Sequence, residues 1–159
     1  MKNIALVLLT CLLFSCKSEA QETTKKETFE VTKTDTEWKA ELSDAEYHVL
    51  RQAGTERPFS SALNKEYRSG TYHCAACDTP LFKSKDKFDS GTGWPSFDQE
   101  IEGNVAFGTD TKIGYTRDEE HCGTCGGHLG HVFNDGPKET TGERHCINGV
   151  ALNFKPDNE

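Results

Sequence analysis

Four of the seven cysteines form two Cys-x-x-Cys pairs, Cys74–Cys77 and Cys122–Cys125. Each tight turn aims two thiolates at one point, and two such turns complete the tetrahedral sulfur coordination that Zn²⁺ prefers. With four protein ligands no position stays open for a substrate, so we predict a structural zinc site. Two redox-active dithiols or two disulfides are the competing interpretations. The adjacent His73 and His121 are expected to be solvated neighbours, not ligands.

Cys146 is the candidate nucleophile once Cys11 and Cys16 in the N-terminal segment are set aside. If it lies on a strand, alternation of the side chains places Arg144, Cys146 and Asn148 on one face. A neighbouring guanidinium stabilises a thiolate and lowers the thiol pKa, and an asparagine amide adds a hydrogen bond to the same region. The alternative is a buried structural thiol, the commonest fate of a free cysteine.

Two histidines and a tryptophan could complete a pocket around this thiol. His128 and His131 would point to opposite sides of a regular strand, but a bulge at Gly130 would bring both to one site. An imidazole near a thiolate supplies the proton that sulfur–oxygen chemistry needs, although such a pair alone is more often structural. Trp94, between a glycine and a proline, is either part of a packed turn or an aromatic wall for a small apolar group.

These residues need a framework of short strands, because helical periodicity is confined to one segment. Ser43 and Glu46 form a capping box, and the apolar stripe that follows predicts a helix ending at Gly54. Beyond it, short apolar runs alternate with glycine-rich turns. Strands are expected at Tyr67–His73, Val105–Phe107, Lys112–Arg117, His131–Phe133 and Arg144–Phe154. We therefore predict a mainly β, antiparallel domain with a short N-terminal helix.

The N-terminal residues predict a secretory signal. After a positively charged start, Ile4–Phe14 is almost wholly apolar and too short to span a bilayer. Ser15 and Cys16 then resemble a bacterial lipobox, in which cleavage precedes the cysteine and the cysteine carries lipid; an ordinary signal peptide is the alternative. We expect a signal peptide at 1–15 and a lipoprotein anchored through Cys16 on the extracytoplasmic side of a membrane, periplasmic or cell-surface.

Composition divides the rest of the chain into a tether and a domain. Residues 16–37 are expected to be a flexible tether, because their polar side chains cannot bury enough surface to offset the entropy of ordering. Residues 38–159 are expected to form one domain. The formal net charge of −8 argues against a nucleic-acid partner. The sequence gives no sign of oligomerisation, and we expect a monomer.

Together these motifs resemble the B-type peptide methionine sulfoxide reductases. The matching runs come in the family's order and span nearly all of residues 38–155: Gly54–Phe59, Tyr72–Cys77, Phe88–Phe97, Gly127–Phe133, Asp135–Pro137 and Gly142–Asn148. The resemblance implies a β-tent of two antiparallel sheets. It also implies reduction of the R epimer of methionine sulfoxide in oxidised proteins, a repair reaction after oxidative stress, with a thioredoxin-like protein as reductant.

The resemblance implies a role for each matching site residue. Cys146 would attack the sulfoxide sulfur and become a sulfenic acid. His128 and His131 would bind and protonate the departing oxygen, and Arg144 would stabilise the thiolate.

Two more positions match the family, and two depart from it. Asn148 would orient the substrate and fix the histidine network, and Trp94 would pack on the sulfur-bound methyl group and so select one epimer. Thr92 stands where many members have a second, resolving cysteine. We therefore expect a one-cysteine form whose sulfenic acid is reduced by an external thiol. His145 replaces a frequent aromatic residue and is expected only to tune the site.

Two other functions compete with the reductase. A non-catalytic zinc β module would bind a ligand or partner on the same fold, since fold does not fix function. A disulfide oxidoreductase would use the Cys-x-x-Cys pairs and carry no stoichiometric zinc.

Overall fold

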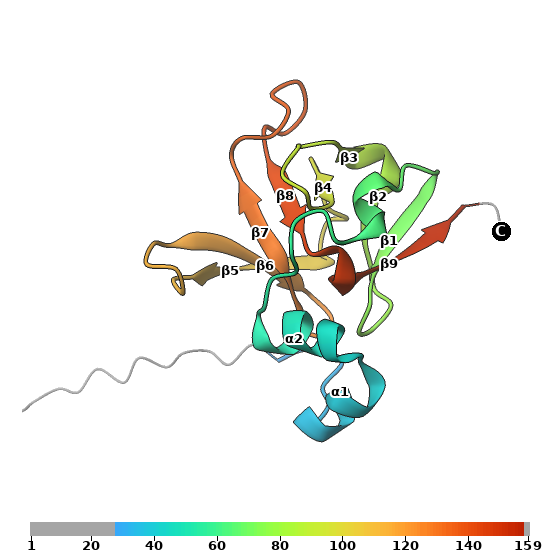
Figure 1. Ribbon diagram of the computed structural model, residues 1–159, viewed down its shortest axis with the longest axis vertical. Helices are drawn as coiled ribbons and strands as arrows, with labels where there is room; N and C mark the ends of the chain where they lie inside the picture. The colour runs from blue at the N-terminus through green and yellow to red at the C-terminus, as the bar shows by residue number, and fades with distance from the viewer. Residues whose placement is uncertain (1–27, 158–159) are drawn as a thin grey trace, which may run out of the picture.

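Two antiparallel sheets form the protein in the computed structural model, which describes residues 28–157 (Figure 1). The smaller sheet has the strand order β2-β1-β9 and the larger one β3-β4-β8-β7-β6-β5. The strands are β1 (Gly70–Cys74), β2 (Pro80–Lys83), β3 (Lys87–Phe88), β4 (Ser96–Phe97), β5 (Val105–Asp110), β6 (Arg117–Cys122), β7 (His128–Phe133), β8 (Arg144–Ile147) and β9 (Leu152–Pro156). The prediction of a mainly β fold with two antiparallel sheets is confirmed.

The predicted helix corresponds to α2 (Asp44–Gln52). A second helix, α1 (Asp35–Glu41), precedes it in the sequence. Ser43 and Glu46 form the expected capping box of α2, and the helix ends at Ala53 in the left-handed conformation, one residue before Gly54. In Figure 1 both helices lie at one end of the sheets. Val49 and Leu50 are buried there and join α2 to the core.

The predicted tether extends too far along the chain. Residues 34–37 form a second capping box, in which the Thr34 hydroxyl accepts from the Glu37 backbone N–H and the Glu37 carboxylate accepts in return. The Val31 backbone N–H donates to Thr124 O at 3.0 Å, and Trp38 is buried at the end of this segment. Residues 28–37 are therefore part of the folded structure.

Aromatic side chains join the two sheets. Phe82 on β2 and Phe97 on β4 stack with ring centroids 4.4 Å apart, and Tyr72 on β1 meets Phe97 edge-on at 4.9 Å. All three side chains are fully buried. Offset and edge-on ring pairs of this kind add to the stabilisation from area burial.

All five predicted strands differ from the observed ones in their bounds, and for two of them the difference goes beyond a few end residues. Residues 112–116 form the turn between β5 and β6, so β6 starts where the predicted strand ends. The predicted strand Arg144–Phe154 is broken by a 3-10 turn at Gly149–Ala151, and its two halves, β8 and β9, belong to different sheets. The apolar residues after Ile147 therefore do not continue the face of β8.

Several expectations concern residues outside the described range. The signal peptide, the lipid on Cys16 and the first part of the tether fall within residues 1–27. Between residues 28 and 157, no helix has the length and apolar character that crossing a bilayer requires.

Candidate active site

The two Cys-x-x-Cys pairs meet at the junction of the two sheets. Cys74 ends β1 of the smaller sheet and Cys122 ends β6 of the larger one, with Cys77 and Cys125 in the turns that follow. The four Sγ atoms lie within 4.8 Å of one another. The Cys74–Cys125 and Cys77–Cys122 sulfurs are 3.8 and 3.5 Å apart. A tetrahedron with Zn–S bonds of about 2.3 Å has edges of about 3.8 Å, so the cluster fits one sulfur-ligated metal ion.

This geometry bears on the competing interpretations of the pairs. All five cysteines of residues 28–157 are free thiols, so neither pair forms a disulfide here. Neither His73 nor His121 belongs to the metal-binding group, as expected. The His73 ring instead bonds to the backbone oxygen of Asp78 at 2.8 Å.

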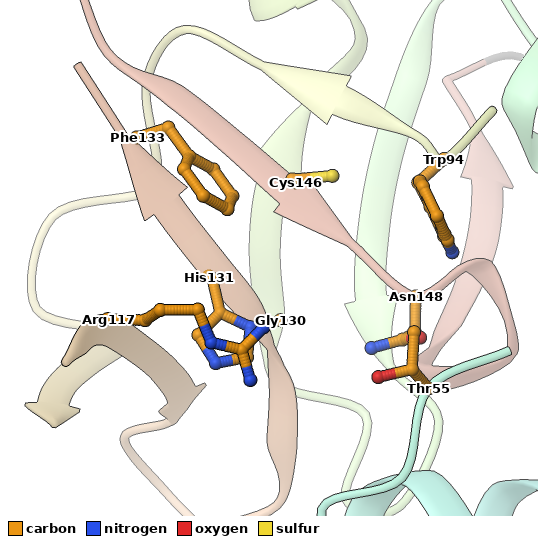
Figure 2. A pocket seen from close by; sticks show the side chains of 8 residues that line it. All are labelled: Thr55, Trp94, Arg117, Gly130, His131, Phe133, Cys146 and Asn148. Atoms are coloured by element: carbon orange, nitrogen blue, oxygen red, sulfur yellow. The ribbon is translucent and has the colours of Figure 1, made fainter. Parts of the chain in front are cut away.

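Cys146 faces a separate pocket of about 120 Å³ on the larger sheet. Figure 2 shows its sulfur in the pocket, pointing toward Trp94, with Phe133 on the other side. The cysteine lies on β8 between two cross-strand neighbours, Ser96 on β4 and His131 on β7. Directly opposed residues of antiparallel strands share a face, so the side chains of His131 and Cys146 project from the same face of the sheet.

A bulge turns both histidines to the same side, as predicted. Glu120 on β6 pairs with Gly130, but the next residue, His121, pairs with His128, so β7 carries an extra residue between them. The rings of His128 and His131 consequently lie 5.4 Å apart. Gly130 is required for this packing, because a Cβ there would lie 2.0 Å from the Cys146 oxygen.

A carboxylate fixes the proton on the His131 ring. Nε2 of His131 lies 3.0 Å from Oδ2 of Asp110, and the Lys112 backbone N–H, together with His131 and Arg117, holds the pKa of Asp110 well below its usual range. An ionised carboxylate only accepts hydrogen bonds, so Nε2 donates and Nδ1 keeps a free lone pair. Burial lowers the pKa of His131. In the neutral ring, Nδ1 is therefore the nitrogen that can accept a proton.

Burial opposes ionisation of Cys146. It raises the pKa of this thiol above its usual value, and the Arg144 guanidinium and the Thr92 hydroxyl lower the pKa by less. The effect of Arg144 has the predicted direction, but its guanidinium also bonds the Asp135 carboxylate at 2.7 and 3.0 Å. The positive charge of Arg144 is therefore shared between the Asp135 carboxylate and Cys146. Arg144 thus acts on the Cys146 thiol in the predicted direction, and burial opposes it.

The pH dependence of Cys146 alkylation tests this balance. Only the thiolate reacts, so the rate is expected to rise with pH through a midpoint above that of an ordinary cysteine. Arg144→Met removes the charge that lowers the pKa and should move the midpoint further to alkaline pH, whereas Arg144→Lys should move it less. Iodoacetamide labelling followed by peptide mass spectrometry measures both. A wild-type midpoint below pH 7 contradicts the burial argument.

Comparison with known proteins assigns the family, because a profile of the SelR domain matches residues 42–156. The chain belongs to the SelR family. Among its relatives is the peptide methionine sulfoxide reductase MsrB of Pseudomonas putida, 54% identical over 79% of this chain and 95% of that protein. The proteins of the same name from Leptospira interrogans and Methanosarcina barkeri are 51% and 53% identical, each over 81% of this chain and over 98% and 91% of those proteins. The resemblance seen in the motifs is thus confirmed for the family.

The residues expected from the SelR resemblance are only partly brought to the pocket. Trp94, His131, Cys146 and Asn148 line it. His128 does not line the pocket; its Nδ1 lies 2.6 Å from a Glu119 carboxylate oxygen, and its ring lies 5.4 Å from the His131 ring.

Arg144 contacts the pocket of this SelR domain indirectly, by packing on the ring of a residue that lines it. Its guanidinium lies 4.4 Å from the centroid of the Phe133 ring, and Phe133 forms one wall of the pocket. Sequence reasoning did not single out three other lining residues: Thr55, Arg117 and Phe133. All but Arg117 lie within the motif runs that identified the family, which was the signal available for them.

Glu56 was also missed, and it holds two of the expected SelR site residues. Its backbone N–H donates to Asn148 Oδ1 at 2.9 Å, and its backbone oxygen accepts from Trp94 Nε1 at 3.2 Å. Its carboxylate accepts from the backbone N–H groups of Gly149 and Val150 at 2.6 and 3.0 Å. Glu56 therefore fastens the Gly54–Phe59 segment to the chain that follows β8.

Proposed function

We infer that this chain reduces methionine-R-sulfoxide in proteins to methionine, with Cys146 as the nucleophile. The reaction follows from the SelR family and from the reductases that are 51–54% identical over about four fifths of the chain. One observation supports the choice of nucleophile. Within residues 28–157, Cys146 is the one cysteine outside the metal-binding group, and it faces a pocket.

We propose a route for one proton. In the proposed reaction the Cys146 thiol gives its proton to Nδ1 of His131, and the thiolate attacks the sulfoxide sulfur. The sulfoxide oxygen takes up the proton and moves from the substrate sulfur to Cys146 Sγ. The Sγ–O bond forms as the substrate S–O bond and the transient Sγ–S bond break. Methionine leaves, and the oxygen remains on Cys146 as a sulfenic acid. Cys146 is oxidised by two electrons and the sulfoxide is reduced by two, so the step balances without a further reactant.

The side chains around Cys146 favour a small apolar group beside the reacting sulfur. Trp94 has its indole fixed by the bond to Glu56, and Phe133 lies across the pocket. We propose that the methyl group of the substrate packs on the Trp94 ring while the oxygen faces His131. The opposite epimer would exchange these two groups and place the oxygen against the aromatic ring.

A thiol reductant must restore Cys146. We propose that its first thiol attacks the sulfenic acid and releases water, and that its second thiol releases Cys146 and forms a disulfide in the donor. Within residues 28–157 the remaining cysteines belong to the metal-binding group, and Thr92 stands near the nucleophile, its Oγ1 3.9 Å from the Cys146 sulfur. This arrangement supports the one-cysteine form with a thioredoxin-like donor.

Thr92→Cys is expected to create an internal resolving thiol. The distance of 3.9 Å between Thr92 Oγ1 and Cys146 Sγ places the new sulfur within a small rotation of bonding distance. After one equivalent of substrate without reductant, the variant should contain a Cys146 disulfide, whereas the native chain and Thr92→Ser should retain a sulfenic acid that reacts with dimedone. Peptide mass spectrometry distinguishes the products. Equal dimedone labelling in all three proteins contradicts the prediction.

We propose Zn²⁺ as the metal of the four-cysteine group. The tetrahedral spacing of the sulfurs and the all-thiolate ligand set suit this ion. Four protein ligands close the coordination sphere, so the ion would join the two sheets and take no part in the reaction. Binding of one zinc ion per chain is measured by elemental analysis.

A substrate-epimer assay tests the proposed activity. Separate peptides carrying R- and S-methionine sulfoxide are incubated with the purified domain and dithiothreitol, and methionine is measured by chromatography. We expect turnover of the R epimer and none of the S epimer. Failure to reduce the R epimer by zinc-loaded, folded protein overturns the proposed function.

We also propose that Cys16 carries lipid and holds the domain on the extracytoplasmic side of a membrane. The support is the sequence of residues 1–16, with its positive start, short apolar run and small residue before the cysteine. When the full chain is expressed in a bacterial host, radiolabelled palmitate should enter the native protein and Cys146→Ser but not Cys16→Ser. Equal labelling of Cys16→Ser contradicts the anchor. Light scattering of the soluble domain tests the expected monomer.

A further inference from the structure

Glu56 directly follows a residue that lines the catalytic pocket, Thr55, but does not line the pocket itself. Figure 2 shows Thr55 on the Trp94 side of the pocket, across from His131. Residues 53–57 form neither helix nor strand. Bonds to other parts of the chain must therefore fix the place of this segment.

The backbone of Glu56 bonds to both sides of the site. Its carbonyl oxygen accepts from Trp94 Nε1 at 3.2 Å, and its N–H donates to Asn148 Oδ1 at 2.9 Å. The Nδ2 of Asn148 in turn donates to Leu129 O at 2.8 Å, on the strand β7 that also carries His131. Glu56 therefore connects the indole proposed to hold the substrate methyl group with the strand of the histidine proposed to face the oxygen.

The carboxylate of Glu56 anchors this backbone. It accepts from the N–H groups of Gly149 and Val150, at 2.6 and 3.0 Å, in the 3-10 turn that follows Asn148. Asn148 is the N-cap residue of that turn, but its side chain makes no capping bond. The carboxylate of Glu56 thus takes the part of a cap, with bonds of the stronger, charge-assisted class.

The turn and the Glu56 segment are packed without spare room. A Cβ at Gly149 would lie 2.1 Å from Ser61 Oγ and 3.3 Å from Glu56 Oε1. A side chain at this position would therefore push the carboxylate and the turn apart. Movement of the carboxylate would pass through the backbone of Glu56 to the indole and amide that it holds.

We propose that Glu56 is a positioning residue of the reduction. Its carboxylate holds its own peptide groups in place, and these groups fix the distance between the Trp94 ring and the strand of His131. That distance determines how closely the small group on the substrate sulfur must fit, so Glu56 strengthens the preference for a methyl group over a larger one. The proposal rests on the proposed reductase function and adds to it a residue that does not touch the substrate.

Two substrates measure the fit. One is a peptide with methionine-R-sulfoxide, and the other is the same peptide with ethionine-R-sulfoxide, whose sulfur carries an ethyl group. One extra methylene in a fitted pocket changes kcat/KM by about 10–200-fold, so the native enzyme with dithiothreitol is expected to prefer the methionine peptide by at least about tenfold. The ratio of the two kcat/KM values does not depend on how much of a preparation is folded. A merely structural role of Glu56 would therefore leave the ratio unchanged.

Two variants of Glu56 change the anchor by different amounts. Glu56→Gln keeps the size of the side chain but replaces one acceptor oxygen with a donor, so one backbone N–H group loses its partner. The methionine-to-ethionine ratio is expected to fall by about threefold, as the loss of one hydrogen bond allows. Glu56→Asp keeps both acceptor oxygens but shortens the side chain by one methylene, and its ratio should lie between those of the native enzyme and Glu56→Gln. It also provides the test if Glu56→Gln does not fold.

Glu66→Gln is the matched control. The Glu66 carboxylate also accepts from a backbone N–H, that of Arg68 at 2.9 Å, and Glu66 does not line the pocket. Thermal melting should show a lower midpoint for this variant, as for Glu56→Gln, because each loses a bond to the backbone. The methionine-to-ethionine ratio of Glu66→Gln should nevertheless equal the native ratio.

The outcomes separate the two proposals. If the native enzyme reduces neither peptide, the proposed function fails. The positioning role fails, and the reductase assignment stands, if the native enzyme reduces both peptides equally well or if the folded Glu56 variants keep the native ratio. The same conclusion holds if Glu66→Gln lowers the ratio as much as Glu56→Gln, because general destabilisation would then explain the change.

Discussion

Cys146→Ser is expected to abolish reduction of methionine-R-sulfoxide while leaving the fold and the metal in place. A serine oxygen cannot form the sulfenic acid that receives the substrate oxygen. The other thiols of residues 28–157 lie in the metal-binding group, apart from the pocket, and cannot substitute. Loss of a covalent nucleophile costs about 10⁴-fold or more in other enzymes, so turnover should fall below detection.

Three measurements on this variant separate the candidate functions. Turnover is followed with the R-epimer peptide, metal content by elemental analysis and the fold by thermal melting. If the protein is a reductase, Cys146→Ser loses turnover but keeps its metal content and its thermal transition. A non-catalytic β module would bind its ligand or partner equally well with and without the substitution. A disulfide oxidoreductase keeps its activity in Cys146→Ser and loses it when Cys74 or Cys122 is replaced. Turnover by Cys146→Ser at the native rate would rule out the assigned nucleophile.

Local signals predicted the elements of this fold well where the decisive contacts are close in sequence. The capping box of Ser43 and Glu46 involves residues three apart, and it defined the start of α2. Thr34 and Glu37 present the same signal for α1. It was missed because the polar composition around it indicated a tether, while the stabilising contact is the burial of Trp38 in the distant core.

The break between β8 and β9 depends on contacts that the local sequence does not contain. Residues 144–154 alternate as a strand should, yet the chain turns at Gly149. The turn is held by the carboxylate of Glu56, more than ninety residues earlier, which binds the backbone N–H groups of Gly149 and Val150. No periodicity within the segment reports such a partner.

The difference between local and distant contacts also explains which residues of the site could be predicted. Sequence reasoning found Cys146, His131 and Trp94, whose types and motifs carry the chemistry. It did not find Asp110, because the contact with His131 arises from the register of three neighbouring strands. Sequence reasoning also considered only the effect of Arg144 on the pKa of the Cys146 thiol. Burial acts in the opposite direction and has the larger influence on that pKa.

Removal of the metal is expected to unfold the domain. The four sulfurs tie β1 of the smaller sheet to β6 of the larger one, and Cys74, Cys122 and Cys125 are almost completely buried. Structural zinc sites in small peptides contribute about 10–16 kcal/mol, as much as the entire stability of about 5–15 kcal/mol of a typical domain. Chelation should therefore abolish the cooperative thermal transition, and added Zn²⁺ should restore it. A metal-free chain that melts cooperatively at the native midpoint contradicts this prediction.

Exchange of the metal distinguishes a structural ion from a catalytic one. Because the pocket of Cys146 contains no residue of the four-cysteine group, Co²⁺ in place of Zn²⁺ should leave kcat/KM for the R-epimer peptide unchanged. The cobalt protein should also show the absorption of a tetrahedral thiolate complex, which reports directly on the ligand set. A large change in kcat/KM with a native melting curve would mean that the ion acts on the reaction. The closed sulfur tetrahedron argues against that, since it leaves the metal no position for substrate.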